Sequence, residues 1–177
     1  YGTDTMPTVA PGDFLPMGGR REVTMLALRR LFQAAPVPAE NVALADGAPF
    51  GRVLVAEQGC TLCLSCVGAC PTGALLDNPD APMLRFNEEA CVQCGLCRNT
   101  CPEKVITLEP RINFGPDARR DVLLKEEDPF ICVSCGEPFG TRSTIAKMLE
   151  TLSGHSLFAD DPKALARLRM CEKSRPF

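Results

Sequence analysis

Two cysteine runs decide the fold of this chain: CTLCLSCVGACP at residues 60–71 and CVQCGLCRNTCP at residues 91–102. Both have the spacing C-x2-C-x2-C-x3-C-P. This spacing is typical of chains that hold two 4Fe-4S cubanes. Zinc knuckles and disulfide frameworks also contain C-x2-C pairs, but neither needs two complete runs of this asymmetric form. We therefore expect two iron-sulfur clusters.

The geometry of the runs predicts which thiolates share a cluster. Three cysteines on one tight loop can bind three irons of one cube. The last cysteine of each run is displaced by one further residue, is followed by proline and points away, so it is expected to bind the other cube. The predicted ligands of cluster I are Cys60, Cys63, Cys66 and Cys101, and those of cluster II are Cys91, Cys94, Cys97 and Cys70.

An internal repeat of 31 residues contains the two runs. A shift by this period superimposes the cysteines and also pairs Leu75 with Ile106. Each half is expected to form a short strand, a cluster loop, a short helix and a short strand, with a turn at residues 77–80 between the halves. Because the unit is too small for a large apolar core, the clusters are expected to replace much of it. The residues expected to shield them are Leu62, Leu64, Val92 and Leu96.

The composition restricts the possible classes of protein. The 177 residues carry a formal net charge of -3 and include 11 cysteines, eight of them in the two runs. Because an oxidising compartment damages thiolates and clusters, a cytoplasmic protein is expected. No apolar stretch approaches the roughly 18 residues of a membrane helix, so no membrane span is expected. The chain begins at Tyr1, which allows a fragment or a processed form and leaves open a missing N-terminal signal.

The distribution of charge indicates the type of partner. Residues 52–109 contain seven acidic and four basic side chains, whereas residues 110–177 contain ten and eleven. Bound clusters with four thiolates add negative charge, so the acidic segment is expected to attract a basic patch on a redox partner or oxidoreductase subunit. Nucleic acid is not expected as a partner, because the basic residues are interspersed with acidic ones. The chain also has one tyrosine and no tryptophan, so it offers no surface for base stacking.

A helix is expected at residues 21–35, ended by Pro36, between an extended arm at residues 1–19 and a linker at residues 36–51. Packing of this helix on the cluster domain is favoured over docking to another subunit, since helical spacing indicates burial without naming the partner. Its predicted apolar face consists of Val23, Leu26, Ala27, Leu31 and Ala34, widened by Leu28 and Phe32.

The C-terminal part is expected to be largely helical. A loop at residues 110–129 with one short strand at 122–124 leads to a predicted helix at 141–153. A second helix is expected to start at Asp161-Pro162, where an N-cap residue precedes proline. The predicted domains are residues 1–51 for the N-terminal arm, helix and linker, 52–109 for the dicluster domain, and 110–177 for the linker and helical module.

A third group of cysteines begins with Cys132-Val133-Ser134-Cys135-Gly136, which is typical of a zinc knuckle. Cys171 follows the predicted helices and is expected to return to the knuckle. The position where a C-x2-C pair would have its second cysteine is Ser174. Structural zinc normally has four protein ligands, and the fourth is left open between His155, the only histidine, and Ser174 or water. For His155 itself, a solvent-facing position in the turn after Gly154 is favoured. A third iron-sulfur cluster and the absence of metal are the alternatives.

The segments CTLCLSCVGACPTGAL, CVQCGLCRNTCPEKVITL and FICVSCGEPFGTRSTIAKMLETLSGH carry a resemblance to known families. The two runs resemble those of bacterial dicluster ferredoxins. Residues 50–174 as a whole resemble bacterial 4Fe-4S proteins associated with formate dehydrogenase systems. The resemblance implies an α+β protein with the pseudo-twofold 2x 4Fe-4S ferredoxin fold, an N-terminal arm and helix, and a small helical C-terminal module with a metal knuckle. In that family the module ends in a Cys-x-x-Cys pair, from which this chain departs at Ser174.

These features predict an electron carrier or a non-catalytic oxidoreductase subunit that relays single electrons through two clusters. The sequence contains no glycine-rich dinucleotide loop, no Walker loop and no acid-base constellation. A catalytic cluster enzyme would need an open iron, whereas all eight cysteines are present. A redox-sensing or assembly protein for a molybdoenzyme is the alternative, and reversible cycling without cluster loss distinguishes a carrier from it.

Overall fold

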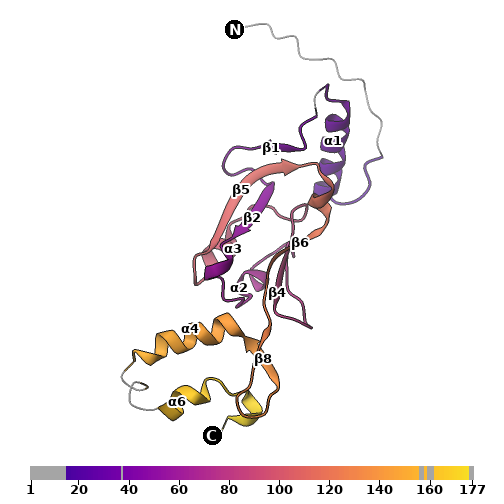
Figure 1. The fold of residues 1–177 in the computed structure, drawn as a ribbon. Coiled ribbons are helices and arrows are strands. Elements are labelled where there is room, and N and C mark those ends of the chain that lie inside the picture. The colour runs from indigo at the N-terminus through magenta and orange to yellow at the C-terminus, as the bar shows by residue number, and fades with distance from the viewer. Residues whose placement is uncertain (1–14, 37, 156–157, 159–161, 176–177) are drawn as a thin grey trace.

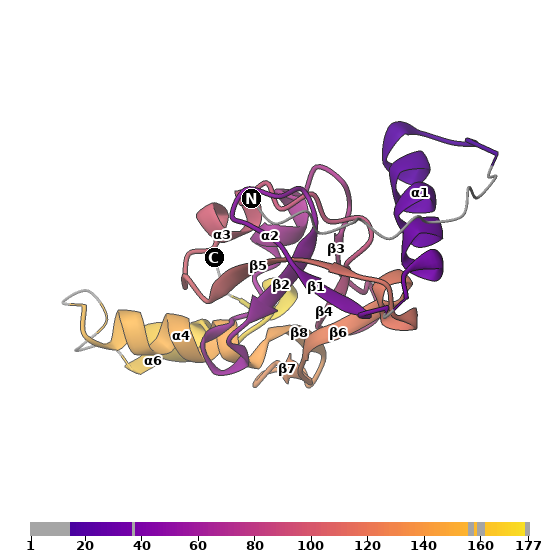
Figure 2. The same ribbon diagram turned by 90° about the horizontal axis from the view of Figure 1, so that it is seen from above.

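The computed structural model describes residues 15–36, 38–155, 158 and 162–175 (Figure 1). Short helices and small antiparallel sheets make up its architecture. Helix α1 (Arg20–Ala34) lies at one end of the elongated structure and helix α4 (Arg142–Ser153) at the other, as both views show (Figure 2). The cysteine runs therefore lie between two flanking segments. The arm predicted at residues 1–19 falls mostly outside the described residues.

The two halves of the repeat pair through their strands. Strand β2 (Gly51–Val55) precedes the first cysteine run and pairs antiparallel with β5 (Ile106–Asn113), which follows the second run. Strand β3 (Leu75–Leu76) follows the first run and pairs antiparallel with β4 (Met83–Asn87), which precedes the second. The turn predicted at residues 77–80 leads from β3 into the loop before β4.

One short helix lies within each run. Helix α2 (Ser65–Gly68) carries Cys66, and helix α3 (Leu96–Thr100) carries Cys97. Both helices are too short to be stable alone, so their position depends on packing. Both halves thus have the predicted order of strand, loop, helix and strand.

Segments outside the repeat add one strand to each sheet. Strand β1 (Asn41–Ala43) pairs with β5, and β6 (Asp121–Glu126) pairs with β4, which gives the strand orders β1-β5-β2 and β3-β4-β6. The segment predicted as a linker at residues 36–51 therefore contains a strand. All three residues of β1 are exposed, so no alternation of buried side chains marks it in the sequence. The strand predicted at 122–124 extends over six residues.

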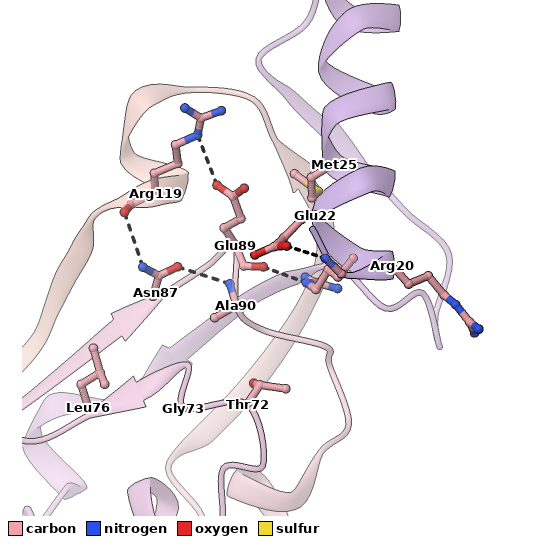
Figure 3. A pocket seen from close by; sticks show the side chains of 12 residues that line it. Arg20, Glu22, Met25, Thr72, Gly73, Leu76, Asn87, Glu89, Ala90 and Arg119 are labelled. Carbon is pink, nitrogen blue, oxygen red and sulfur yellow. Dashed lines mark hydrogen bonds and ion pairs between the residues drawn. The ribbon is translucent and has the colours of Figure 1, made fainter. Parts of the chain in front are cut away.

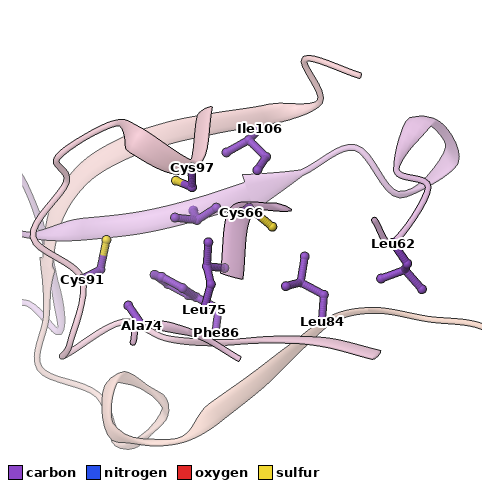
Figure 4. Packing of buried hydrophobic residues seen from close by; sticks show 10 residues of the cluster. Leu62, Cys66, Ala74, Leu75, Leu84, Phe86, Cys91, Cys97 and Ile106 are labelled. Atoms are coloured by element: carbon purple, nitrogen blue, oxygen red, sulfur yellow. The ribbon is translucent and has the colours of Figure 1, made fainter. Parts of the chain in front are cut away.

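The hydrophobic core is formed by both sheets and both cysteine runs (Figure 4). Leu75 and Leu84 are its most completely buried large side chains. Three cysteines of the runs are themselves buried members of this core, as expected for a unit with little apolar volume. The buried core consists of Val53, Leu62, Cys66, Ala74, Leu75, Leu84, Phe86, Cys91, Cys97 and Ile106.

Helix α1 packs on the cluster domain, and the apolar face predicted for it is confirmed only in part. Leu26 and Leu31 of that face are 37% and 57% exposed. Phe32 of the predicted face is half-buried, and its ring stacks on Phe114 with 4.5 Å between ring centroids. The buried residue Met25 lies outside the predicted face. The helix therefore contacts the domain through a face that overlaps the predicted one and also includes Met25.

The contact face of α1 includes two arginines. Arg21 donates hydrogen bonds to three backbone carbonyl groups, and Arg29 forms an ion pair of 2.8 Å with Glu89. Long arginine side chains can cover apolar surface while their guanidinium groups satisfy buried carbonyls. Polar contacts of these arginines therefore contribute to the rotation of this helix, together with the apolar packing of Met25 and Phe32.

The C-terminal module begins with a hairpin of β7 (Pro129–Ile131) and β8 (Pro138–Thr141). The hairpin loop carries Cys132 and Cys135. The rings of Phe130 and Phe139 meet edge to face across the two strands, with centroids 5.6 Å apart. The loop that carries Cys132 and Cys135 is thus positioned by the antiparallel pair β7 and β8.

Helix α4 confirms the helix predicted at residues 141–153. Thr141 is its N-cap, and its Oγ1 accepts a hydrogen bond from the Thr144 backbone at 3.2 Å. Helix α6 (Pro162–Arg167) follows, while the predicted N-cap Asp161 lies outside the described residues. No helix in the described parts of the chain is long and apolar enough to cross a membrane.

Candidate iron-sulfur and metal centres

Three positions in each half of the repeat have a left-handed backbone. The 31-residue shift that relates the cysteines also relates these positions, and their φ angles lie between 51° and 80°. The pairs are Leu62 and Gln93, Leu64 and Gly95, and Gly73 and Lys104. This conformation costs a residue with a Cβ atom roughly 1–2 kcal/mol. Four of the six residues are not glycine, so the tight loops hold strain that interactions at the cysteines must offset.

The first cavity brings together Cys60, Cys63, Cys66 and Cys101. These are three cysteines of the first run and the last cysteine of the second. Apolar side chains form much of the remaining wall: Val55, Leu62, Leu64, Leu84, Val105 and Ile106. Four thiols that converge in an apolar wall suit the four-thiolate coordination of a 4Fe-4S cluster.

The second cavity brings together Cys70, Cys91, Cys94 and Cys97. The apolar residues in its wall are Val53, Ala74, Leu75, Phe86, Val92 and Leu108. Each cavity therefore combines three cysteines of one run with the fourth cysteine of the other. Leu96, expected to be a shielding residue, is 46% exposed and lies outside both walls, because it starts α3 on its outer side.

The cysteine thiols differ in their ease of ionisation. Burial raises the pKa of Cys66 to about 11, and the neighbouring thiols Cys60 and Cys63 contribute. Burial also raises the pKa of Cys97. At Cys63, burial again acts to raise the pKa, but hydrogen bonds with Ser65 outweigh it and lower the value. Crowded thiols of this kind become thiolates when positive charge compensates them, and bound iron supplies such charge.

Hydrogen-bond donors point at cysteine sulfur atoms. The backbone N–H of Ala74 donates to Cys70 Sγ at 3.2 Å, and the side chain of Gln93 donates from Nε2 to Cys91 Sγ at 3.5 Å. Donors directed at sulfur stabilise negative charge on a thiolate and on a reduced cluster. The donor set, the cavities and the thiols together fit two 4Fe-4S clusters.

A cation from outside the repeat contacts each cysteine loop. The Lys125 ammonium group donates hydrogen bonds to the carbonyl oxygens of Cys60 and, at 2.8 Å, of Glu57. Arg21 Nη2 donates to the carbonyl oxygen of Cys91 at 2.5 Å. Burial raises the pKa of both Cys60 and Cys91, and the charges of Lys125 and Arg21 oppose these increases. The two cations therefore act on equivalent positions of the two loops.

The C-terminal module brings Cys132, Cys135 and Cys171 together, with all three sulfur atoms within 4.8 Å of one another. Zinc-sulfur bonds of about 2.3 Å place tetrahedral ligands roughly 3.8 Å apart, so this spacing suits one metal ion. Ser174 Oγ lies 3.5 Å from Cys171 Sγ. His155 does not belong to this group, and its ring lies against Phe158 after the end of α4.

The thiol of Cys132 ionises more readily than that of an ordinary cysteine. Burial acts to raise its pKa, but backbone N–H groups of Cys171, Cys135 and Ser134 outweigh burial and lower the pKa to about 6. One of these donors, Cys171 N, lies 3.3 Å from Cys132 Sγ. Because the thiolate is the form that binds metal, this geometry suits a metal ligand.

The same module contacts the loop of the first cavity. The side-chain hydroxyls of Thr141 and Thr144 both donate to the carbonyl oxygen of Thr61, at 2.9 Å and 2.7 Å. Thr61 lies between the first two cysteines of its run and is 8% exposed. The start of α4 therefore holds one cysteine loop directly.

An open cleft lies between the start of α1 and parts of both halves of the repeat (Figure 3). Glu89 in this cleft pairs with Arg29 at 2.8 Å and with Arg119 at 3.4 Å. None of the described residues that line the cleft is a cysteine. Its charged groups brace α1 against the domain.

Sequence patterns did not identify four residues at these sites: Arg21, Lys125, Thr141 and Thr144. Each lies at least 30 positions from the cysteine loop that it contacts, and none belongs to a motif with known spacing. No local signal could have found them, because folding alone brings them to the loops.

Comparison with known proteins agrees with this geometry. Residues 59–106 match the family described as the 4Fe-4S dicluster domain. The chain is 33% identical over 63 residues to the pyruvate synthase subunit PorD of Thermotoga maritima, which covers 36% of the chain and 63% of that subunit. It is 46% identical over 50 residues to the polyferredoxin-like subunit of an aliphatic sulfonate oxidoreductase of Pyrococcus furiosus, which covers 28% of the chain and 27% of that subunit.

The cysteine geometry, the family match and these relatives together support a 4Fe-4S ferredoxin-type domain in this chain. The first relative is named as a subunit of pyruvate synthase and the second as a subunit of an aliphatic sulfonate oxidoreductase, and the chain covers less than two thirds of the length of each. The similarity to these relatives therefore covers no more than 36% of the chain.

Proposed function

We propose that this chain is a non-catalytic electron-transfer protein or subunit, which relays single electrons through two 4Fe-4S clusters to or from a larger oxidoreductase. One observation carries the proposal: two cavities each combine three cysteines of one run with the fourth cysteine of the other. This crossed arrangement is the ligand pattern of dicluster proteins.

In the proposed ligand sets, cluster I is bound by Cys60, Cys63, Cys66 and Cys101, and cluster II by Cys91, Cys94, Cys97 and Cys70. A bound 4Fe-4S cluster supplies one-electron chemistry between two oxidation states. The protein holds the thiolates in place, excludes water with apolar walls and directs N–H groups at sulfur. Cys63 and Cys94 are exposed members of the two sets, so they mark the sides of the domain where electrons enter and leave.

The proposed partners are other redox proteins or oxidoreductase subunits, and a formate-dehydrogenase-type enzyme is our first candidate because of the sequence resemblance. The acidic charge of residues 52–109 supports docking to a basic surface. We propose a cytoplasmic setting, since reducing conditions protect eleven unpaired cysteines.

We further propose that Cys132, Cys135 and Cys171 bind one structural zinc ion, with Ser174 or water as the fourth ligand. The close spacing of the sulfur atoms and the low pKa of Cys132 support this assignment. The proposed division remains residues 1–51, 52–109 and 110–177, although β1 and β6 of the outer parts add strands to the cluster domain.

A redox-sensing or assembly role for a molybdoenzyme is the second candidate. The hydrogen bonds from Thr141 and Thr144 to Thr61 favour it, because they connect the C-terminal module to the loop of cluster I. In this case, oxidation of the cluster would alter the module and its partner. A carrier would instead complete many redox cycles without losing iron.

The decisive test is anaerobic purification with analysis of iron, sulfide and reversible reduction. We expect eight irons and eight sulfides per chain, since two cubanes each contain four. We also expect electron transfer to a separate partner to slow with rising salt, because exposed charges are screened over about 8 Å at physiological ionic strength. Four irons per chain would contradict the proposal, and rates independent of salt would indicate a permanently assembled subunit.

A further inference from the structure

The carbonyl groups of Cys60 and Cys91 occupy equivalent positions in the repeat, and a side-chain cation contacts each. Lys125 comes from β6, after the repeat, and Arg21 comes from α1, before it. The two cations therefore belong to opposite flanking segments. Each cation donates a hydrogen bond to the carbonyl oxygen of the first cysteine of one run.

Several contacts fix the two cations. Arg21 also donates from Nε to Glu89 O at 2.8 Å and from Nη1 to Pro49 O at 2.9 Å, and its guanidinium lies 4.7 Å from the centre of the Phe50 ring. Lys125 is held by two carbonyl groups. The positive charges thus have defined positions beside the loops, unlike those of freely rotating surface side chains.

The charge of these cations is not neutralised by a close ion pair. In the described parts of the chain, neither Arg21 nor Lys125 has a carboxylate oxygen within 4 Å. The nearby Glu89 carboxylate already pairs with Arg29 and Arg119. The ligands of both cations are neutral carbonyl oxygens, so most of the positive charge acts on the adjacent loops.

We propose that Arg21 and Lys125 set the reduction potentials of the two clusters, with Arg21 raising that of cluster II and Lys125 that of cluster I. The inference rests on the proposed function, because it requires both clusters. Reduction adds one electron, and a fixed positive charge in a partly desolvated site stabilises the reduced form over the oxidised form. The flanking segments would therefore adjust the potentials of a domain whose ligands are otherwise the same in both halves.

The test compares Arg21→Gln and Lys125→Gln with Arg30→Gln and Lys147→Gln in redox titrations of the full chain followed by EPR. The two controls remove the same net charge at exposed positions of α1 and α4. We expect each of the first two variants to shift the reduction equilibrium of a different cluster about tenfold toward the oxidised form, or about 59 mV for a one-electron couple. The two control variants should leave the reduction potentials of both clusters unchanged.

Arg21→Lys separates charge from hydrogen bonding, because it keeps the charge and loses the three-way guanidinium contact. A potential close to the wild-type value in Arg21→Lys, together with a lowered one in Arg21→Gln, supports an electrostatic role. Equal potentials in Arg21→Gln, Lys125→Gln and the controls overturn the inference and leave both side chains as structural braces.

Iron content distinguishes this inference from the proposed function. Eight irons in the wild-type chain with unshifted potentials in the variants reject only the tuning role, whereas a lower iron content in the wild-type chain rejects the clusters themselves. If Arg21→Gln fails to assemble, Lys125→Gln decides the question at the other loop, where the cation bonds only two carbonyl groups.

Discussion

The Thr141 hydroxyl donates a hydrogen bond of 2.9 Å to the carbonyl oxygen of Thr61 across 80 positions of sequence. The same hydroxyl oxygen accepts a hydrogen bond from the backbone N–H of Thr144 in the first turn of α4. One side chain therefore caps a helix and holds a cysteine loop. This contact joins the C-terminal module to the site of cluster I, and no corresponding contact from the module to the second loop appears among the described residues.

Removal of the second hydroxyl at this contact should loosen the loop. We expect Thr144→Val to lower the local stability of the first cysteine loop by about 1 kcal/mol, the usual net value of one hydrogen bond. Amide hydrogen exchange across residues 60–66 measures the effect. The control is Thr151→Val, whose hydroxyl bonds only within α4. Equal exchange in both variants would contradict the coupling.

Crossed ligation predicts that the last cysteine of each run belongs to the other cluster. Cys70→Ala should damage cluster II, which is bound mainly by the second run, and Cys101→Ala should damage cluster I. EPR spectra of the surviving cluster, combined with iron counts, measure the loss. The two variants serve as controls for each other. Loss of cluster I in Cys70→Ala would show that the ligand assignment is wrong.

The equivalent residues Gly73 and Lys104 offer a matched test of backbone strain, with φ angles of 64° and 54°. A Cβ atom at position 73 would meet no atom within 4 Å, so Gly73→Ala should cost about 1–2 kcal/mol through its backbone alone. Lys104→Gly should stabilise the protein by less, because glycine loses roughly 0.5–1 kcal/mol more on folding.

Anaerobic thermal unfolding, followed by visible absorption, measures both changes. Gly68→Ala is the control, because Gly68 lies in α2 without a positive φ and also has open space around it. Alanine should be tolerated there. Destabilisation of Gly68→Ala equal to that of Gly73→Ala would contradict the strain argument.

The proposed zinc site can be tested at its fourth position. Ser174→Cys should slow the release of zinc to a chelator at least tenfold, because thiolate is a much better zinc ligand than a hydroxyl group. Cys171→Ser should release the metal yet leave the visible absorption of both clusters intact. His155→Ala should change neither property. Zinc loss in His155→Ala would identify the histidine as a ligand, and absence of zinc from the wild-type chain would reject the site.

Much of the cluster domain could be predicted from the sequence by itself. The spacing of the cysteines and the 31-residue repeat indicated two equivalent halves, and both halves have the expected order of elements. Helix α4 was also predictable, since Thr141 and Gly154 mark its ends. These features depend on interactions between residues close in sequence, so local spacing and capping are sufficient to indicate them.

Other features were decided only by the tertiary structure. The rotation of α1 depends in part on the hydrogen bonds of Arg21 to distant carbonyl groups. Strand β1 pairs with an edge of β5, although its own residues are exposed. Lys125 belongs to no cysteine motif, yet it contacts the first cysteine loop. Hydrogen bonds to backbone carbonyls do not depend on the side chain of the acceptor residue, so such long-range partners leave no pattern in the sequence.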